Sequence, residues 1–252
     1  KDQRVNFGFM DRFIVDENFA VAKALEKQIP KKPKRNNTIA SKFFHKTSCY
    51  TCPTCGNGLL TKMMNERKLI ELMTNGVTIV DPETTWISED TEIGQDTIVY
   101  PSTYIEGKNK IGKACKIGPF AHLRGGVEIC DNVKIGNFVE VKNSFVGDGT
   151  KACHLAYVGD CDIGKGCNIG CGAIFVNYNG RSKNRTVVGD NCFIGSNSNI
   201  IAPVKIESNT YICAGTTITN DVKEDDFVIG RVRQEVKENR AHNYLKEKKE
   251  SK

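Results

Sequence analysis

From Ile87 onward, an aliphatic residue returns at every sixth position of the chain. The series runs through Ile87, Ile93, Val99, Ile105, Ile111, Ile117, Leu123, Ile129, Ile135 and Val141. A small or apolar residue commonly follows four positions later, and glycine often follows at once. The series shifts by one residue at Val146 and again at Ile163, and it resumes from Val188 to Ile218. Because six residues form one short strand and a turn but no helical hairpin, the pattern predicts a parallel β-helix.

Three six-residue units close one triangular coil, in which the aliphatic residue and the small residue four positions later point inward. Cys115, Cys167 and Cys192 occupy the small inward position, so we interpret them as packing thiols. The repeat resembles that of the left-handed hexapeptide proteins, whose coils break the right-handed crossover rule. The expected fold class is all-β: a left-handed parallel β-helix of hexapeptide repeats, with short helical segments on its N-terminal side and in the C-terminal tail.

The pattern divides the chain into four segments. Residues 1–62 form an extension of unknown role, with a helix in "DENFAVAKALEKQI", a basic linker and the element "CPTCG". Residues 63–86 are expected to form a linker helix and a first strand. Residues 87–230 form the β-helix, and residues 231–252 form a basic tail.

The period also predicts which polar side chains point outward. Arg124 and Lys142 each follow an aliphatic column residue and are 18 residues apart, so they stack on adjacent coils. Adjacent strands lie about 4.8 Å apart, and two cations at that distance repel unless an anion lies between them. The pair therefore indicates a phosphate or carboxylate site, and the alternative is two solvated side chains that splay apart. His154 and Tyr157 are also outside the inward positions, which argues against a buried histidine.

Two further features of the repeat indicate a binding surface. Ser196 and Ala214 are another outward pair one coil apart, and they leave a narrow strip of small residues on the wall. "NYNGRSKNRT" interrupts the period between Val176 and Val188 and must leave the helix as a loop. Loops on rigid scaffolds frequently carry binding residues.

Several longer motifs resemble one enzyme family over about residues 63–235. They include "IGPFAHLRGG", "VKIGNFVEVK", "GTKACHLAYVGD", "CNIGCGAIFVNYNGRSKNRTVVGDN" and "FIGSNSNIIAPVKI". They resemble the C-terminal half of the bifunctional glucosamine-1-phosphate N-acetyltransferase and N-acetylglucosamine-1-phosphate uridyltransferases. The resemblance implies acetyl transfer from acetyl-CoA to the amine of glucosamine-1-phosphate, for synthesis of UDP-N-acetylglucosamine. It also implies a homotrimer with active sites between subunits.

The resemblance assigns roles residue by residue. It makes His154 the general base that takes a proton from the sugar amine, a role that suits an imidazole. The implied sugar-phosphate residues are Arg124, Lys142, Tyr157, Asn168 and Lys183. The implied acetyl-CoA residues are Cys171, Asn177, Tyr178, Ser196, Ala214 and Arg231. No metal and no acyl-enzyme are expected, because a thioester is already an activated donor.

Some features depart from this family. "LRGG" stands where proline usually follows the arginine, and Cys171 and Cys153 stand where smaller residues are usual. The uridyltransferase domain is expected to be absent, because about 60 residues are too few for a nucleotide-binding α/β domain. Three alternatives stay open: an inactive structural trimer, an acetyltransferase of another amino sugar, and a metal-using β-helix. The last is disfavoured because the repeat region holds only His122 and His154.

Composition limits the partners and the cellular location that we expect for the protein. The net charge of +6 arises partly from "IPKKPKR" and "YLKEKKESK", which we interpret as solvated runs rather than as a nucleic-acid site. No apolar run approaches a membrane span, and no signal peptide is expected from "KDQRVNFGFMDRF". The odd total of 11 cysteines fits reduced thiols in the cytoplasm. Cys52 and Cys55 are half of a zinc-ribbon element, so they form either a zinc site that Cys49 and His45 complete or a set of solvated thiols.

Overall fold

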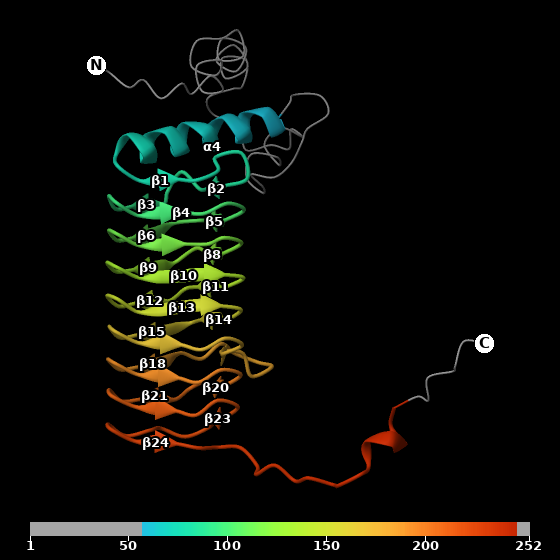
Figure 1. Cartoon of the computed structure of the whole chain (residues 1–252). Coiled ribbons are helices and arrows are strands. Elements are labelled where there is room, and N and C mark those ends of the chain that lie inside the picture. Colours follow the sequence, from blue (N-terminus) through green and yellow to red (C-terminus); the bar gives the residue numbers. More distant parts are fainter. Residues whose placement is uncertain (1–56, 246–252) are drawn as a thin grey trace, which may run out of the picture.

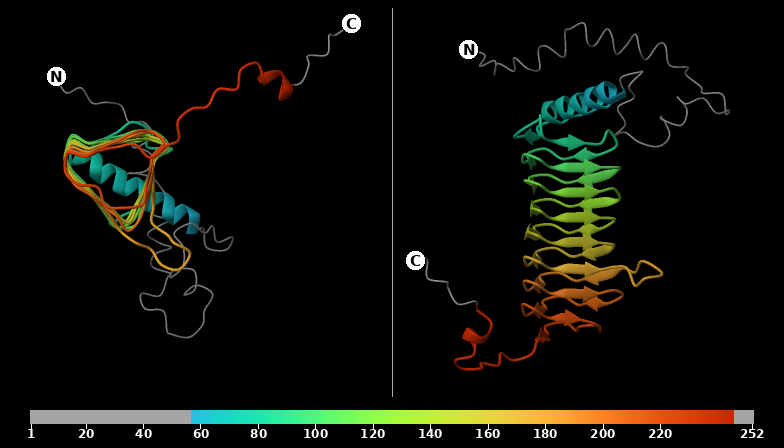
Figure 2. Two further views of the ribbon diagram at one scale, coloured as in Figure 1. Left: turned by 90° about the horizontal axis from the view of Figure 1, so that it is seen from below. Right: turned by 90° about the vertical axis from the view of Figure 1, so that its right-hand side faces the viewer.

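The computed structural model describes residues 57–245 and confirms the predicted left-handed parallel β-helix. Three parallel sheets form its walls, with nine, eight and seven strands in the described residues; we call them sheets A, B and C. From β1 to β23 every third strand joins the same sheet, so the chain visits A, B and C in turn, and the last strand, β24, returns to sheet A (Figure 1). Seen along its axis, the β-helix has a triangular outline (Figure 2).

The strands are short, as the six-residue period requires. Sheet A contains β1 (Thr78–Ile79), β4 (Ile98–Val99), β7 (Lys116–Ile117), β10 (Lys134–Asn137), β13 (Lys151–His154), β16 (Asn168–Ile169), β19 (Phe193–Ile194), β22 (Tyr211–Ile212) and β24 (Phe227–Val228). Sheet B contains β2 (Trp86–Ile87), β5 (Tyr104–Glu106), β8 (His122–Arg124), β11 (Glu140–Lys142), β14 (Tyr157–Gly159), β17 (Ile174–Val176), β20 (Asn199–Ile201) and β23 (Thr217–Ile218). Sheet C contains β3 (Glu92–Ile93), β6 (Asn109–Ile111), β9 (Val127–Ile129), β12 (Phe145–Val146), β15 (Cys161–Ile163), β18 (Thr186–Val188) and β21 (Lys205–Ile206).

The core is the interior of the triangle. The aliphatic residues of successive coils pair in register, as Ile117 does with Ile135 and Ile135 does with Ala152. Cys115, Cys167 and Cys192 are buried, which confirms their interpretation as packing thiols. Each fully buried Ile or Val stabilises the fold by about 1.5–3 kcal/mol, and the stack repeats this contribution on every coil.

Helix α4 (Asn57–Thr74) lies across the first coil and covers the end of the β-helix (Figures 1 and 2). Its own residues Leu69 and Leu72 are buried. The side chain of Asn65 donates to Thr85 O (3.0 Å) and accepts from Ile87 N (2.8 Å). An open sheet end exposes backbone polar groups, and Asn65 satisfies two of them where the β-helix begins.

The β-helix begins one strand earlier than the boundary expected at residue 87. Strand β1 hydrogen-bonds to β4 and therefore belongs to sheet A, within the segment expected to hold a first strand. The six-residue period does not reveal this strand. The apolar residues Val77 and Ile79 precede a turn that lengthens the first coil, so the next aliphatic residue of the series, Ile87, does not follow at the sixth position. At the other end, the chain leaves the β-helix after β24 and includes the short 3₁₀ helix η1 (Ala241–Asn243) (Figure 1).

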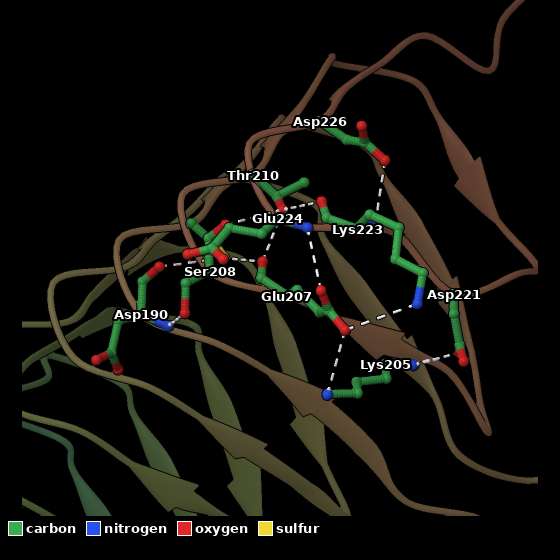
Figure 3. Close-up of polar contacts among 10 residues, drawn as sticks. Asp190, Lys205, Glu207, Ser208, Thr210, Asp221, Lys223, Glu224 and Asp226 are labelled. Carbon is green, nitrogen blue, oxygen red and sulfur yellow. Dashed lines mark hydrogen bonds and ion pairs between the residues drawn. The ribbon is translucent and has the colours of Figure 1, made fainter.

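Charged side chains tie the last coils together around Glu207 (Figure 3). Its carboxylate lies 3.3 Å from Lys205 Nζ and 3.7 Å from Lys223 Nζ, and it accepts a hydrogen bond from Glu224 N. The hydrogen bond from Lys205 is the main reason that the pKa of Glu207 lies below its usual range. All these groups have partners within the chain, so the cluster contributes to structure.

The features predicted for the N-terminal extension lie outside the described residues. They are the helix in "DENFAVAKALEKQI", the basic linker, and the possible zinc ligands Cys49, Cys52, Cys55 and His45. Within residues 57–245, no three His, Cys, Asp or Glu side chains converge as a metal site would require. No helix in this range is long and apolar enough to cross a membrane.

Candidate active site

The outward residues of interest follow two vertical edges of the β-helix. The A–B edge consists of the turns that lead from sheet A to sheet B, such as Leu155. The B–C edge consists of the turns that lead from sheet B to sheet C, such as Asn143 and Asp160. Sheet B separates the two edges.

His154 ends strand β13 at the A–B edge. Its backbone pairs with Asn137, and the following residue, Leu155, turns the chain with φ 42° and donates its N–H to Asn137 O (3.0 Å). This corner directs His154 to the solvent side, so the prediction of an outward histidine is confirmed. Its imidazole has no hydrogen bond or ion pair with any residue of 57–245. The ring can therefore accept a proton from a ligand.

Below His154, the turns of successive coils stack into a strip along the A–B edge. Cys171, Ser196 and Ala214 are exposed members of this strip, one on each coil. Backbone hydrogen bonds connect the turns in sequence: Gly172 N to Leu155 O (2.8 Å), Asn197 N to Cys171 O (2.8 Å) and Gly215 N to Ser196 O (2.8 Å). Arg231 closes the lower end by donating from Nη1 to Ala214 O (2.7 Å). The strip carries small side chains and ends at a cation.

A second group of predicted residues gathers at the B–C edge. Lys142 ends β11, and Lys183 lies in the loop of residues 177–185 that projects from this edge (Figure 2). The proximity of Lys183 is the main reason that the pKa of Lys142 lies below its usual range. Neither ammonium group forms an ion pair within the described residues. Two close, unpaired cations are the arrangement that binds a phosphate or carboxylate.

Arg124 differs from the expectation that its partner would be an external anion. Its Nη1 donates to Glu140 Oε1 (2.9 Å), and its Nε lies 3.6 Å from Glu106 Oε1. The hydrogen bond that Arg124 donates to Glu140 is the main reason that the pKa of Arg124 is raised. Glu106 stands one coil above Arg124 and is paired with it in register. The protein therefore supplies anions for Arg124, while Lys142 and Lys183 remain free.

Tyr157 and Asn177 connect the cations to the middle of sheet B. The phenol of Tyr157 lies over Gly159, where an added Cβ would be 2.5 Å from the hydroxyl oxygen. Asn177 Nδ2 donates to that hydroxyl (3.2 Å) and also to Asp160 Oδ2. Tyr178 is exposed, donates to Gly180 O (2.8 Å) and forms an antiparallel bridge with Lys183. The loop is thus a small hairpin that carries Lys183.

Asn168 is not brought to this group within one chain. It lies in β16 of sheet A, in register with Lys151 and Phe193, whereas Tyr157 lies in sheet B. His154 and the lysines are also on opposite edges of sheet B. Leu155 and Asp160 are five positions apart, which at about 3.3 Å per residue places the edges at most about 17 Å apart. A single chain therefore holds the predicted residues in two groups, with Asn168 apart from both.

Asp160 is a site residue that the sequence reasoning missed. It is 7% exposed and accepts hydrogen bonds from Asn143 and Asn177, beside the two lysines. The available signal was spacing: Asn143, Asp160 and Asn177 are 17 residues apart, one coil each where the repeat loses a residue. Glu106 and Glu140 were also missed. Glu106 is one coil before Arg124, and Glu140 lies on β11, the neighbouring strand of sheet B.

Fold and site together define a hexapeptide-repeat β-helix protein with a free histidine beside a strip of small residues. The family description "Bacterial transferase hexapeptide (six repeats)" matches residues 110–143 and 185–220. Within that class, the chain is 43% identical over 209 residues to "Bifunctional protein GlmU" of Clostridium novyi (strain NT). It is 45% identical over 210 residues to the protein of the same name from Acetivibrio thermocellus.

These alignments cover 70% of this chain but only 45% and 46% of the two relatives, so the chain spans about half of their length. Among solved structures, the chain has a low similarity to a mutant of perosamine N-acetyltransferase from Caulobacter crescentus in complex with CoA and GDP-perosamine. That similarity has a TM-score of 0.35 and 16% identity, and it covers 66% of this chain and 63% of the other.

Proposed function

We propose that the protein transfers the acetyl group of acetyl-CoA to the amine of glucosamine-1-phosphate, which yields N-acetylglucosamine-1-phosphate for UDP-N-acetylglucosamine synthesis. The observation that carries the proposal is the unpaired His154 at the upper end of the small-residue strip. The motif resemblance and the similarity to bifunctional GlmU proteins over 70% of the chain support it.

His154 acts as the general base. Its imidazole takes a proton from the sugar amine as the nitrogen attacks the thioester carbonyl carbon. The carbon–sulfur bond then breaks, and the thiolate of coenzyme A leaves and takes up a proton. The exposed ring has no competing partner in the described residues, and an imidazole accepts protons near neutral pH. The carbonyl is already activated as a thioester, so the proposal needs no metal and no covalent acyl-enzyme.

The B–C edge holds the phosphate of the sugar. Lys142 and Lys183 provide two free ammonium groups, and Tyr157 and Asn177 provide polar groups beside them. Glu140 and Glu106 offset the charge of Arg124, so Arg124 must leave these carboxylates to bind the phosphate. Charge-assisted hydrogen bonds to phosphate are the strongest polar contacts available to this surface.

The A–B strip holds acetyl-CoA. Cys171, Ser196 and Ala214 leave room for a narrow chain along the wall, and Arg231 at the lower end suits the phosphates of the nucleotide part. Asn177 and Tyr178 lie at the base of the loop on the B–C edge, and they would add contacts to acetyl-CoA from that edge.

A homotrimer joins the two groups of residues. Within one chain, His154 and the lysine pair lie on opposite edges of sheet B, and Asn168 lies on sheet A. Packing one subunit's A–B edge against another's B–C edge brings a histidine to a lysine pair, and a cyclic trimer repeats this contact three times. We place the enzyme in the cytoplasm, where all eight described cysteines, which are free thiols, would stay reduced.

The direct test is a thiol-release assay with acetyl-CoA and glucosamine-1-phosphate. The proposal expects stoichiometric release of coenzyme A thiol and formation of the N-acetylated sugar phosphate. No thiol release from a correctly folded chain would contradict it and would favour the structural alternative. Transfer only to another amino sugar would retain the chemistry and change the substrate.

A further inference from the structure

Asp160 carries a buried carboxylate at the base of the lysine pair. Its backbone N–H donates to Lys142 O (3.0 Å), so it lies directly on the coil below Lys142. Asn143 Nδ2 donates to Asp160 Oδ1 (2.6 Å), and Asn177 Nδ2 donates to Oδ2. Both carboxylate oxygens are therefore occupied by neutral amides.

The same hydrogen bonds determine where the loop begins. Asn177 is the first residue of the 177–185 loop, and its carbonyl accepts from Asn184 N (2.7 Å). Tyr178 and Lys183 form the bridge inside this ring. The contact of Asn177 with Asp160 thus fixes the hairpin that presents Lys183 next to Lys142.

Charge explains why a carboxylate is needed there. Burial favours the neutral acid, but the amide hydrogen bonds and the charges of Lys142 and Lys183 outweigh it, so the pKa of Asp160 lies below its usual range. The negative charge in turn opposes the repulsion between the two ammonium groups. Because Asn143 and Asn177 occupy its oxygens, Asp160 forms no ion pair with either lysine, and both keep their donors for a ligand.

We propose that Asp160 is the positioning residue of the anion site: it holds Lys142 and the Lys183 hairpin together so that both ammonium groups bind one phosphate. The inference rests on the proposed function and deepens it by naming the group that sets phosphate recognition. Two expectations of opposite sign separate this role from a simple charge effect. A carboxylate that only repelled the phosphate would, when neutralised, strengthen phosphate binding; a positioning carboxylate would, when neutralised, weaken it.

The test is calorimetric titration of the full chain with glucosamine-1-phosphate, using wild type, Asp160→Asn and a matched control. The control is Asp190→Asn, because Asp190 also bonds a neighbouring coil through Lys165 N (2.9 Å) but lies at another edge. We expect Kd to rise about tenfold or more in Asp160→Asn and to stay within about threefold in the control. In acetyl transfer, KM for the sugar phosphate should rise while kcat at saturation changes little.

The pH dependence gives a readout that a purely structural role would not change. Lys142 faces Lys183 and Arg124, which lower its pKa, and Asp160, which raises it. Without the Asp160 charge, Lys142 loses its proton at lower pH. As pH rises, the Kd of Asp160→Asn should therefore begin to increase at a lower pH than that of wild type.

Asn143→Gly keeps the left-handed backbone at Asn143 (φ 45°) and removes one amide donor, so it tests the inference if Asp160→Asn fails to fold. It should raise Kd in the same direction. Unchanged or tighter binding in the folded variants would overturn the inference while leaving acetyl transfer intact. A third outcome is that wild type binds the sugar phosphate, Asp160→Asn loses that binding, and wild type transfers no acetyl group. That outcome would refute the proposed function and leave the inference about Asp160 intact.

Discussion

At the residue scale, the proposed chemistry depends on outward side chains that contribute little to the core. His154 is exposed and has no partner in the described residues, and Lys142 is half-buried at a turn. Buried residues of the same strands, Ala152 in β13 and Val141 in β11, hold the fold and point to the opposite side. Activity and stability should therefore respond to different substitutions.

His154→Ala should lower turnover by about 10²- to 10⁴-fold, the usual cost of removing a general base. Because the side chain is exposed, the free energy of unfolding should change by less than about 0.5 kcal/mol. Steady-state kinetics and thermal unfolding measure the two effects. Lys151→Ala is the matched control, since Lys151 is an exposed residue at the start of the same strand. Loss of folding, or an unchanged rate, would show that the imidazole is structural or idle.

Lys142→Ala should instead raise KM for glucosamine-1-phosphate and change kcat at saturation much less. The ammonium attracts the ground-state phosphate and the transition state alike, so its loss removes uniform binding. Full kinetic curves for both substrates separate the two constants, with KM for acetyl-CoA as the internal control. A fall in kcat equal to that of His154→Ala would place Lys142 in the chemical step.

At the scale of the repeating element, the coil tolerates no extra volume where one turn crosses the next. A Cβ at Gly136 would lie 1.9 Å from Cys153 O, which is backbone and cannot move aside. Gly149 has φ +68° but no atom within 4 Å of its added Cβ. The first glycine is required for close approach between coils, and the second is required only for its backbone angle.

Gly136→Ala should therefore destabilise the fold by about 2–3 kcal/mol or more, as overpacking of a tight contact does. Gly149→Ala is the matched control and should cost about 1–2 kcal/mol, from the left-handed backbone alone. Denaturant unfolding of both variants gives the comparison. Equal losses would mean that the coils separate easily at Gly136.

The element scale also explains what could be predicted from the sequence. The six-residue period predicted the three walls, the buried thiols and the outward direction of His154, because each depends only on the count of residues. The Asp160 cluster was hidden because its members are 17 residues apart, where the 18-residue coil has lost one residue. The pairing of Arg124 with Glu140 depends on side-chain reach between strands, which a residue count does not supply.

At the scale of the whole molecule, the predicted residues form two groups on opposite edges of sheet B. The period predicts that residues point outward, but it does not predict which edges meet in an assembly. The proposed trimer completes a site from the histidine of one subunit and the lysines of another. This arrangement makes each subunit incomplete alone.

Mixed trimers test this arrangement. His154→Ala and Lys142→Ala chains should each have low activity alone when the sugar phosphate is below KM. After unfolding and refolding together in equal amounts, about a quarter of the sites should contain both intact groups if they come from different subunits. Thiol release should recover to about that fraction of wild type. Mixtures no more active than the average of the two variants would place the whole site within one chain.

The most direct measurement of the central claim is the ratio of kcat/KM for glucosamine-1-phosphate to that for glucosamine, with acetyl-CoA as donor. If Lys142 and Lys183 bind the phosphate while His154 deprotonates the amine, the phosphorylated sugar should be preferred by about 100-fold or more, since hydrogen bonds to charged groups contribute about 1.5–3 kcal/mol each. Equal values for the two sugars would contradict the account, because the lysine pair would then have no part in choosing the substrate.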